Sequence, residues 1–144
     1  MPSVVMLSLV ILALDPGLNI GIAMVCLDGT VRHLNIITLN DLRSLNPLPS
    51  VTIVIGNGTG SDRVQGILRE QGLSFAVVEE AGTSLEAREL FFRDHPPKGL
   101  AKLLPRGLRF PPRAVDDYAA YAIALRFLKR EADAGGNAHA SEGF

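Results

Sequence analysis

Long apolar runs separated by short polar interruptions dominate the first eighty residues and predict five strands. Residues 4–14 show no polar alternation, which is typical of a central strand that is covered on both faces. The other apolar runs predict strands at 20–27, 30–38, 51–56 and 73–80. The Asp28-Gly29 pair between the second and third runs predicts a hairpin turn, because both residues tolerate positive φ angles.

Helical patterns separated by glycine and proline fill most of the second half of the chain. Residues 57–72 begin with the glycine-rich turn "NGTGS" and predict a helix that Ser61 or Asp62 caps and Gly72 closes. Two further helices are predicted at 84–95 and 114–131, and the proline-containing stretch 96–113 predicts mostly loop. Three antiparallel strands followed by a β-α-β unit indicate an α/β fold with a mixed sheet flanked by helices.

The length of 144 residues and a hydrophobic content of 47% suit one domain with a substantial core. We expect this domain to span residues 1–132 and a disordered tail to follow at 133–144, where small and polar residues show no periodicity. The first fourteen residues lack a basic start and a small-residue cleavage site, and they are too short to span a bilayer, so a buried strand is the better interpretation than a signal peptide or a membrane anchor.

Cysteine content and charge limit the kinds of site and of partner that the chain can have. The single cysteine, Cys26, excludes a disulfide framework and a cysteine-rich zinc site, and it fits a reducing, cytoplasmic location. The formal net charge of −1 provides no overall basic field. A nucleic-acid partner would therefore need a local basic patch.

Acidic residues stand at three places where the predicted elements begin or end: Asp15 after the first strand, Glu79 and Glu80 after the fifth, and Asp116 and Asp117 in the first turn of the last helix. Because the ends of parallel strands share one edge of a sheet, we expect Asp15 and Glu80 to lie close together. At about 100° per residue, Asp117 points inward, away from the polar face of its helix, and Asp116 points sideways.

Converging buried carboxylates repel one another, and a divalent cation would relieve that repulsion. Oxygen ligands suit Mg²⁺ or Mn²⁺, which can promote phosphodiester hydrolysis. Structural interpretations stay open beside this one. Asp15 before Pro-Gly can start a turn, Asp116 can serve the helix dipole, Glu79 can be a solvated strand end, and Asp117 can pair with a nearby arginine.

Four segments together resemble the YqgF and RuvC-type nucleases of the ribonuclease H-like superfamily. The segments are "ALDPGLNIGIAMV" (13–25), "VIGNGTGSDR" (54–63), "VVEEAGTS" (77–84) and "VDDYAAYAIAL" (115–125), the third as it stands in the YqgF-like domain of the transcription accessory protein Tex. The resemblance covers residues 9 to 131. It implies a ribonuclease H-like fold and a metal-dependent nuclease in which Asp15, Glu80 and Asp117 are catalytic residues and metal ligands, with Asp116 as a further candidate ligand.

Two departures from the family pattern stand beside this likeness. Glu-Glu-Ala-Gly-Thr-Ser occupies residues 79–84, where the pre-rRNA-processing proteins usually have Asp-Glu-Arg-Leu-Thr-Thr. Ala114 stands where RuvC resolvases usually have the earlier of two acids in the last helix.

A local excess of positive charge lies between residues 88 and 113, where seven basic residues face two acidic ones. Such a segment predicts salt-dependent phosphate binding, and a solvated loop with ordinary charges is the alternative. The candidate substrate-binding residues there are Arg88, Lys98, Lys102, Arg106, Arg109 and Arg113. Asn57, Thr59, Thr83 and Ser84 are further candidates for contacts to substrate.

The leading hypothesis is a Mg²⁺- or Mn²⁺-dependent endonuclease that acts on branched DNA or structured RNA, as a Holliday junction resolvase or in pre-rRNA processing. By the same resemblance we expect a homodimer. The alternatives are a non-catalytic nucleic-acid-binding accessory module and a binder of nucleotide phosphates. The sequence leaves open the choice between DNA and RNA and between the two metals.

Overall fold

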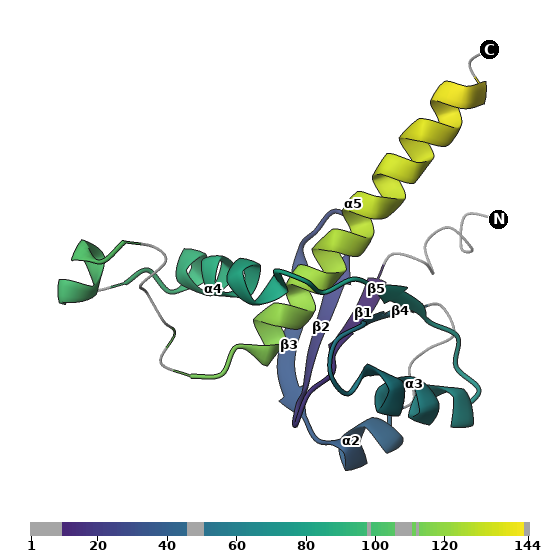
Figure 1. Cartoon of the computed structure of the whole chain (residues 1–144), viewed down its shortest axis with the longest axis horizontal. Coiled ribbons are helices and arrows are strands. Elements are labelled where there is room, and N and C mark those ends of the chain that lie inside the picture. Colours follow the sequence, from purple (N-terminus) through teal and green to yellow (C-terminus); the bar gives the residue numbers. More distant parts are fainter. Residues whose placement is uncertain (1–9, 46–50, 98, 106–110, 112, 143–144) are drawn as a thin grey trace.

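A five-stranded mixed sheet forms the centre of the molecule in the computed structural model, which describes residues 10–45, 51–97, 99–105, 111 and 113–142 (Figure 1). The sheet order is β3-β2-β1-β4-β5, in which β2 pairs antiparallel with β1 and β3, while β1, β4 and β5 are parallel. The strands are β1 (Val10–Asp15), β2 (Ile20–Cys26), β3 (Val31–Ile37), β4 (Thr52–Gly56) and β5 (Ala76–Val78). The predicted α/β fold class, a mixed sheet of antiparallel and parallel strands flanked by helices, is thereby confirmed.

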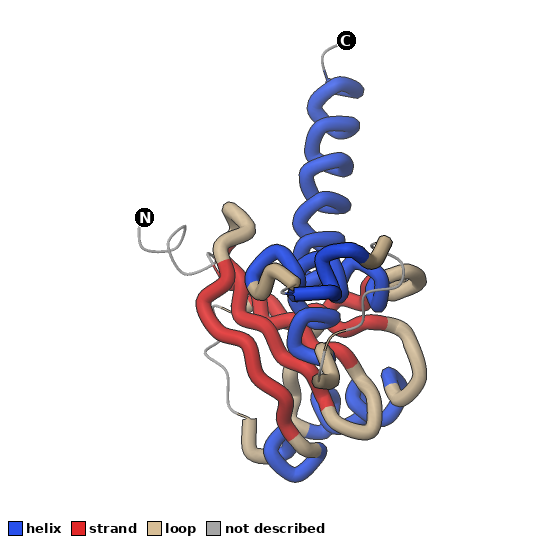
Figure 2. Tube along the Cα trace, turned by 90° about the vertical axis from the view of Figure 1, so that its left-hand side faces the viewer, coloured by secondary structure: helices blue, strands red, loops and turns tan. Residues whose placement is uncertain are grey.

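Helices cover both faces of this sheet. One apolar cluster joins the sheet to α2 and α3, and a second cluster on the opposite face joins it to α4 and α5. The helices are α2 (Leu39–Arg43), α3 (Ser61–Glu70), α4 (Thr83–Asp94), the short 3₁₀ helix η1 (Gly99–Leu103) and α5 (Asp116–Glu142). Figure 2 shows the strands between helices, with α5 rising beyond the sheet.

Strand β1 alternates between the two clusters. Ile11 and Ala13 pack on the side of α4 and α5, and Leu12 and Leu14 pack on the side of α2 and α3. All four side chains are buried, which confirms a central strand without polar alternation. The predicted residues 4–9 of this strand lie outside the described part of the chain.

The hairpin after β2 forms as predicted. Gly29 has a φ of +90°, and the Asp28 carboxylate accepts a hydrogen bond of 2.9 Å from the backbone N–H of Thr30. This bond favours the ionised carboxylate and lowers the pKa of Asp28.

Helix α2 is absent from the sequence prediction. Thr38 and Asp41 form a reciprocal capping box, with the Thr38 hydroxyl accepting from the Asp41 N–H and the Asp41 carboxylate accepting from the Thr38 N–H. Leu42 is completely buried against the sheet. The capping pair and one apolar anchor are sufficient for this short helix, although its length is below that of a periodic pattern.

The predicted cap of α3 is wrong, and its predicted end is confirmed. Gly60, with a φ of +87°, is the N-cap, and no side chain caps the helix. The side chain of Ser61, the first helical residue, accepts a hydrogen bond from Gln65 instead. Gly72, with a φ of +73°, follows the last turn in the left-handed conformation that favours glycine.

Helix α5 is longer than predicted, because it continues to Glu142 through residues expected to form a tail. Alanine, the best helix former, recurs through this segment, and no proline interrupts it. Elsewhere β5 is shorter than the predicted strand 73–80, and η1 lies within the predicted loop 96–113. The division into a domain of 1–132 and a tail of 133–144 stays a prediction.

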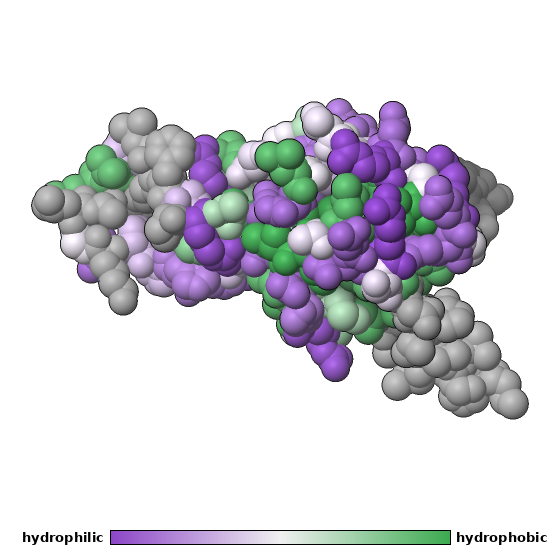
Figure 3. Space-filling model, turned by 90° about the horizontal axis from the view of Figure 1, so that it is seen from below, coloured by the Kyte–Doolittle hydropathy of each residue, from purple (hydrophilic) through white to green (hydrophobic). Residues whose placement is uncertain are grey.

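Hydrophilic residues prevail over much of the face seen from below, with apolar residues between them (Figure 3). Leu18, in the turn between β1 and β2, is fully exposed. Exposed single apolar residues of this kind are common on protein surfaces.

Candidate functional site

Asp15 is the last residue of β1 and one of four buried polar or charged residues among those described. Its side chain leaves the sheet at an edge that the turns after β4 and β5 also reach. The neighbouring strand places Gly21 directly opposite Asp15 in the antiparallel register. The carboxylate therefore stands at the boundary between the apolar core and this edge.

Glu80 is held beside Asp15 by a network of backbone and side-chain contacts. The N–H of Gly58 donates to Glu80 Oε1 at 2.6 Å. The Asn57 amide oxygen accepts from the Glu80 N–H at 3.0 Å, and the Thr83 hydroxyl donates to the Glu80 carbonyl at 2.7 Å. Both the backbone and the carboxylate of Glu80 are thus fixed by residues of neighbouring turns.

Glycine is needed where the chain meets Glu80. A Cβ atom on Gly56 would lie 2.7 Å from Glu80 Oε1, and a Cβ on Gly58 would clash with the same carboxylate. The "GNG" turn after β4 therefore leaves space for an acidic side chain. The same turn was predicted from sequence to contact substrate.

Asp15 and Glu80 are here called the carboxylate pair, and the charge of Glu80 perturbs the ionisation of Asp15. Burial, the charge of Glu80, a hydrogen bond with Glu80 and the charge of Asp116 together raise the pKa of Asp15 from 3.8 to about 8, with burial contributing most. A carboxylate that is buried beside another carboxylate favours its protonated form. At neutral pH Asp15 therefore keeps its proton and shares it with Glu80 in a hydrogen bond.

The first turn of α5 brings two more acids to this edge. Asp117 is buried and Asp116 is half-buried, as the helix angle predicts. Burial and the charge of Asp117 raise the pKa of Asp116. Gly21 permits this approach, because a Cβ there would clash with the Asp116 carbonyl.

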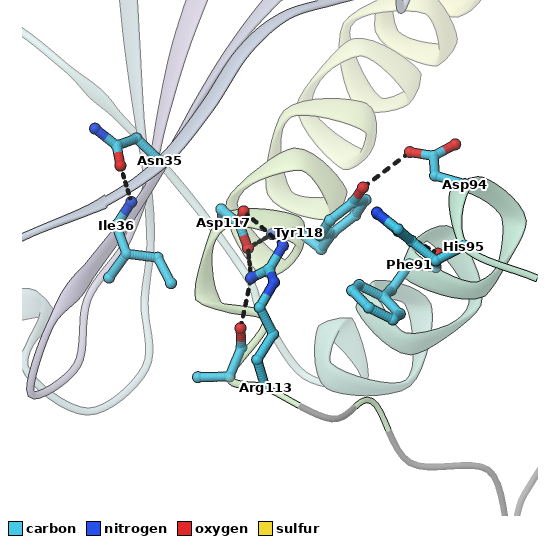
Figure 4. A network of polar contacts seen from close by, with 9 residues as sticks. Asn35, Ile36, Phe91, Asp94, His95, Arg113, Asp117 and Tyr118 are labelled. Atoms are coloured by element: carbon cyan, nitrogen blue, oxygen red, sulfur yellow. Dashed lines mark hydrogen bonds and ion pairs between the residues drawn. The ribbon is translucent and has the colours of Figure 1, made fainter.

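Asp117 is engaged by an arginine. Arg113 donates from Nη1 to Oδ1 at 3.1 Å and from Nη2 to Oδ2 at 3.3 Å, and Figure 4 shows the two groups facing each other. The N–H of Tyr118 also donates to Asp117 Oδ1 at 2.9 Å. Of the two interpretations that the sequence left open for Asp117, the ion pair is present in the structure.

The donor set fits a hard divalent cation in part. The carboxylate pair offers oxygen ligands whose mutual repulsion a cation would relieve. Within the described ranges, however, no three carboxylate, histidine or cysteine side chains gather closely enough to hold a metal ion. Asp117, a third ligand in the sequence prediction, accepts hydrogen bonds from Arg113 at both carboxylate oxygens.

The candidate substrate-binding residues divide into three sets. Asn57 and Thr83 form hydrogen bonds with Glu80, while Thr59 and Ser84 are exposed. Arg88 and Lys102 each take part in an interaction, and Arg113 forms an ion pair with Asp117. Lys98, Arg106 and Arg109 lie outside the described residues.

Sequence reasoning missed Arg126, which it placed on a polar helix face. Its guanidinium forms an ion pair with Glu86 at 2.7 Å and donates to the carbonyl of Glu79 at 2.9 Å. Arg130 donates in the same way to the carbonyl of Val77 at 3.0 Å. These two arginines satisfy outward carbonyls of the edge strand and its following turn, and no sequence signal identifies such a backbone partner.

An aromatic cluster packs beside Arg113. The guanidinium carbon of Arg113 lies 5.4 Å from the ring centroid of Phe91 and 5.8 Å from that of Tyr118. His95 stacks on Phe91, and the Tyr118 hydroxyl donates to Asp94 at 3.0 Å. Burial and the Asp94 hydrogen bond raise the pKa of Tyr118 to about 12. Phe91 is a core residue.

Among solved structures, the RuvC structure from Thermus thermophilus is similar to this chain, with 17% identity and a TM-score of 0.43. The alignment covers 81% of this chain and 92% of that chain. No family model and no curated protein matches the chain. Membership of the YqgF and RuvC-type nucleases stays a prediction.

None of the helices in the described part of the chain combines the length and the apolar character that crossing a bilayer requires.

Proposed function

We propose that this protein is a divalent-metal-dependent nuclease that hydrolyses phosphodiester bonds in structured nucleic acid. The observation that carries the proposal is the carboxylate pair at the edge of the sheet, with the pKa of Asp15 raised to about 8 by burial and by Glu80. Perturbed acids of this kind are concentrated at functional sites. The resemblance of the surrounding motifs to nucleases gives the site its reaction class.

Asp15, Glu80 and Asp117 are the proposed ligands, with Asp116 as a further candidate. When bound, Mg²⁺ or Mn²⁺ would activate water and stabilise the oxygens of an in-line phosphodiester displacement. The residues of the chain itself orient this set. Gly58 and the neighbouring turn fix the Glu80 carboxylate, so that one ligand is already positioned before the ion arrives.

Substrate binding is assigned to the basic segment 88–113, which leads directly into α5. The guanidinium of Arg113, the last basic residue of this segment, lies 3.1 Å from the carboxylate of Asp117. A phosphate group bound at Arg113 would therefore lie next to the acids. Neutralisation of several phosphates predicts binding that weakens steeply as salt increases.

One observation favours a second candidate, a nucleic-acid-binding module without catalysis. The ion pair between Arg113 and Asp117 neutralises one proposed ligand internally. A protein that kept this arrangement permanently would bind nucleic acid through its basic segment and would not gather three acids around an ion.

Cleavage assays separate the two candidates. Labelled four-way DNA junction, single-stranded DNA and structured RNA are incubated with Mn²⁺, Mg²⁺ or EDTA. The nuclease proposal expects metal-dependent cutting that Asp15→Asn, Glu80→Gln and Asp117→Asn each abolish. Glu79→Gln is the matched control, because it removes an exposed carboxylate one residue away from the pair.

Each outcome assigns a function. Cutting that survives in the Asp15 and Glu80 variants would reject the proposed site. Salt-sensitive binding with no cutting of any substrate would support the accessory module. The preferred substrate would distinguish junction resolution from RNA processing, and a sedimentation measurement that shows only monomer would contradict the expected homodimer and the resolvase role.

A further inference from the structure

Asp117 accepts three hydrogen bonds in the structure. Arg113 reaches both of its carboxylate oxygens, at 3.1 and 3.3 Å, and the Tyr118 N–H adds a third hydrogen bond at 2.9 Å. A forked pair of this type combines charge with defined geometry. For Asp117 to bind a cation, at least one of these bonds has to be given up.

Arg113 has two different surroundings. On the inner side its guanidinium donates to the carbonyl of Ala114 at 2.7 Å and lies over the rings of Phe91 and Tyr118. On the outer side it is accessible, because 45% of its side chain is exposed, against 9% for Asp117. An anion from solvent can therefore approach Arg113 while Asp117 stays shielded.

Charge is distributed unevenly over the acids of this edge. The carboxylate pair contains two acids, and the charge of Asp116 also raises the pKa of Asp15. The nearby cation, Arg113, is bonded to Asp117 instead. A divalent ion at the pair would attract Asp117, so that the ion and Arg113 compete for one carboxylate.

We propose that Arg113 is a positioning residue that exchanges Asp117 for a phosphate group of the bound nucleic acid, and that this exchange releases Asp117 to complete the metal site. This inference rests on the proposed nuclease function. The guanidinium fork matches a phosphate as well as it matches a carboxylate, so the exchange replaces one bidentate partner with another. Nucleic acid and metal then bind cooperatively, and the metal site is complete only when substrate is present.

Metal binding without nucleic acid gives the first test. Free Mn²⁺ is measured by electron paramagnetic resonance during titration of the wild type, Arg113→Gln, Asp117→Asn and the double variant. Arg113→Gln is expected to tighten Mn²⁺ binding by about tenfold, which corresponds to the release of one ion pair of about 1.4 kcal/mol. The double variant is expected to lose this gain, because the released ligand is then absent.

A matched control separates release of a ligand from simple loss of positive charge. Arg93→Gln removes the same charge from α4, where Arg93 pairs with Asp94 and not with Asp117. Its effect on Mn²⁺ affinity is expected to be less than twofold. Equal effects of the two arginine variants, or a gain that persists in the double variant, would overturn the inference.

Binding of nucleic acid gives the second test. The affinity for a fluorescent four-way DNA junction is measured by anisotropy with and without Ca²⁺, an oxygen-liganded ion used here in place of Mn²⁺. The wild type is expected to bind about fivefold more tightly with Ca²⁺, and Arg113→Gln by less than twofold, since coupling is reciprocal. Arg113→Lys keeps the charge without the fork and is expected to fall between them.

The results distinguish failure of this inference from failure of the proposed function. Metal-dependent cleavage by the wild type without coupling between metal and junction would overturn the role of Arg113 and leave the nuclease intact. Absence of both Mn²⁺ binding and cleavage would reject the nuclease itself, and the role of Arg113 with it. Thermal unfolding of each variant confirms that it is folded.

Discussion

The raised pKa of Asp15 makes the stability of the protein depend on pH in a direction that can be calculated. An acid whose pKa is higher in the folded state binds its proton more tightly there, so the free energy of unfolding falls as pH rises between the two pKa values. For Asp15 this window extends from 3.8 to about 8. One pKa unit corresponds to about 1.4 kcal/mol, so the full window corresponds to about 6 kcal/mol.

Asp15→Asn removes this dependence. The uncharged amide can keep a hydrogen bond to Glu80, so we expect the stability advantage of the variant over the wild type to be about 4 kcal/mol larger at pH 8 than at pH 5. Urea unfolding in EDTA, followed by circular dichroism because the chain has no tryptophan, measures both values. Comparison with the wild type at each pH cancels the contributions of the other titrating groups.

Two results would refute the reasoning. If Asp15→Asn differed from the wild type by the same amount at pH 5 and pH 8, Asp15 would not be the titrating group. If Glu79→Gln, the exposed neighbouring acid, produced the same pH-dependent difference, general surface charge would explain the effect.

Three further predictions concern the scaffold. Gly58→Ala is expected to displace the carboxylate it now holds and to destabilise the fold by about 1–3 kcal/mol, whereas Gly66→Ala, with no atom near its added Cβ, should be neutral or stabilising in urea unfolding. Arg126→Ala should accelerate amide hydrogen exchange in residues 77–82, and Lys129→Ala, on the same helix face, should not. Tyr118→Phe should cost about 1 kcal/mol in thermal unfolding through loss of its hydrogen bond.

The sheet and the position of its first acid are predictable from sequence for definite physical reasons. An unbroken apolar run indicates burial on both faces, and β1 is the central strand. Parallel strands that end at one edge bring Asp15 beside Glu80, although the two residues are far apart in the chain. Helical periodicity likewise points Asp117 inward. Each of these inferences needs only the direction of a strand or helix and the period with which its side chains repeat.

The contacts that position the site depend on features that no periodic pattern contains. Gly58 and Gly21 look like ordinary turn and strand glycines in the sequence, yet their missing Cβ atoms make room for Glu80 and for the first turn of α5. Arg126 bonds a backbone carbonyl, which leaves no residue-specific signal. Helix α2 is a single capped turn and too short to show a repeat.

Arg113 illustrates why a candidate site is harder to predict than a fold. Its spacing of four residues from Asp117 is compatible with an ion pair, but the residues between them include the start of α5, where helical spacing does not yet apply. The same arginine also belongs to a basic segment suited to phosphate. A carboxylate and a phosphate are equivalent partners for the guanidinium fork, so the sequence leaves the choice between them open.

The structure contains the internal partner, Asp117. The choice between a permanent ion pair and an exchange therefore depends on whether phosphate can compete with a carboxylate that is only 9% exposed. Burial favours the internal pair, while the accessible side of Arg113 favours exchange once nucleic acid and metal are both present.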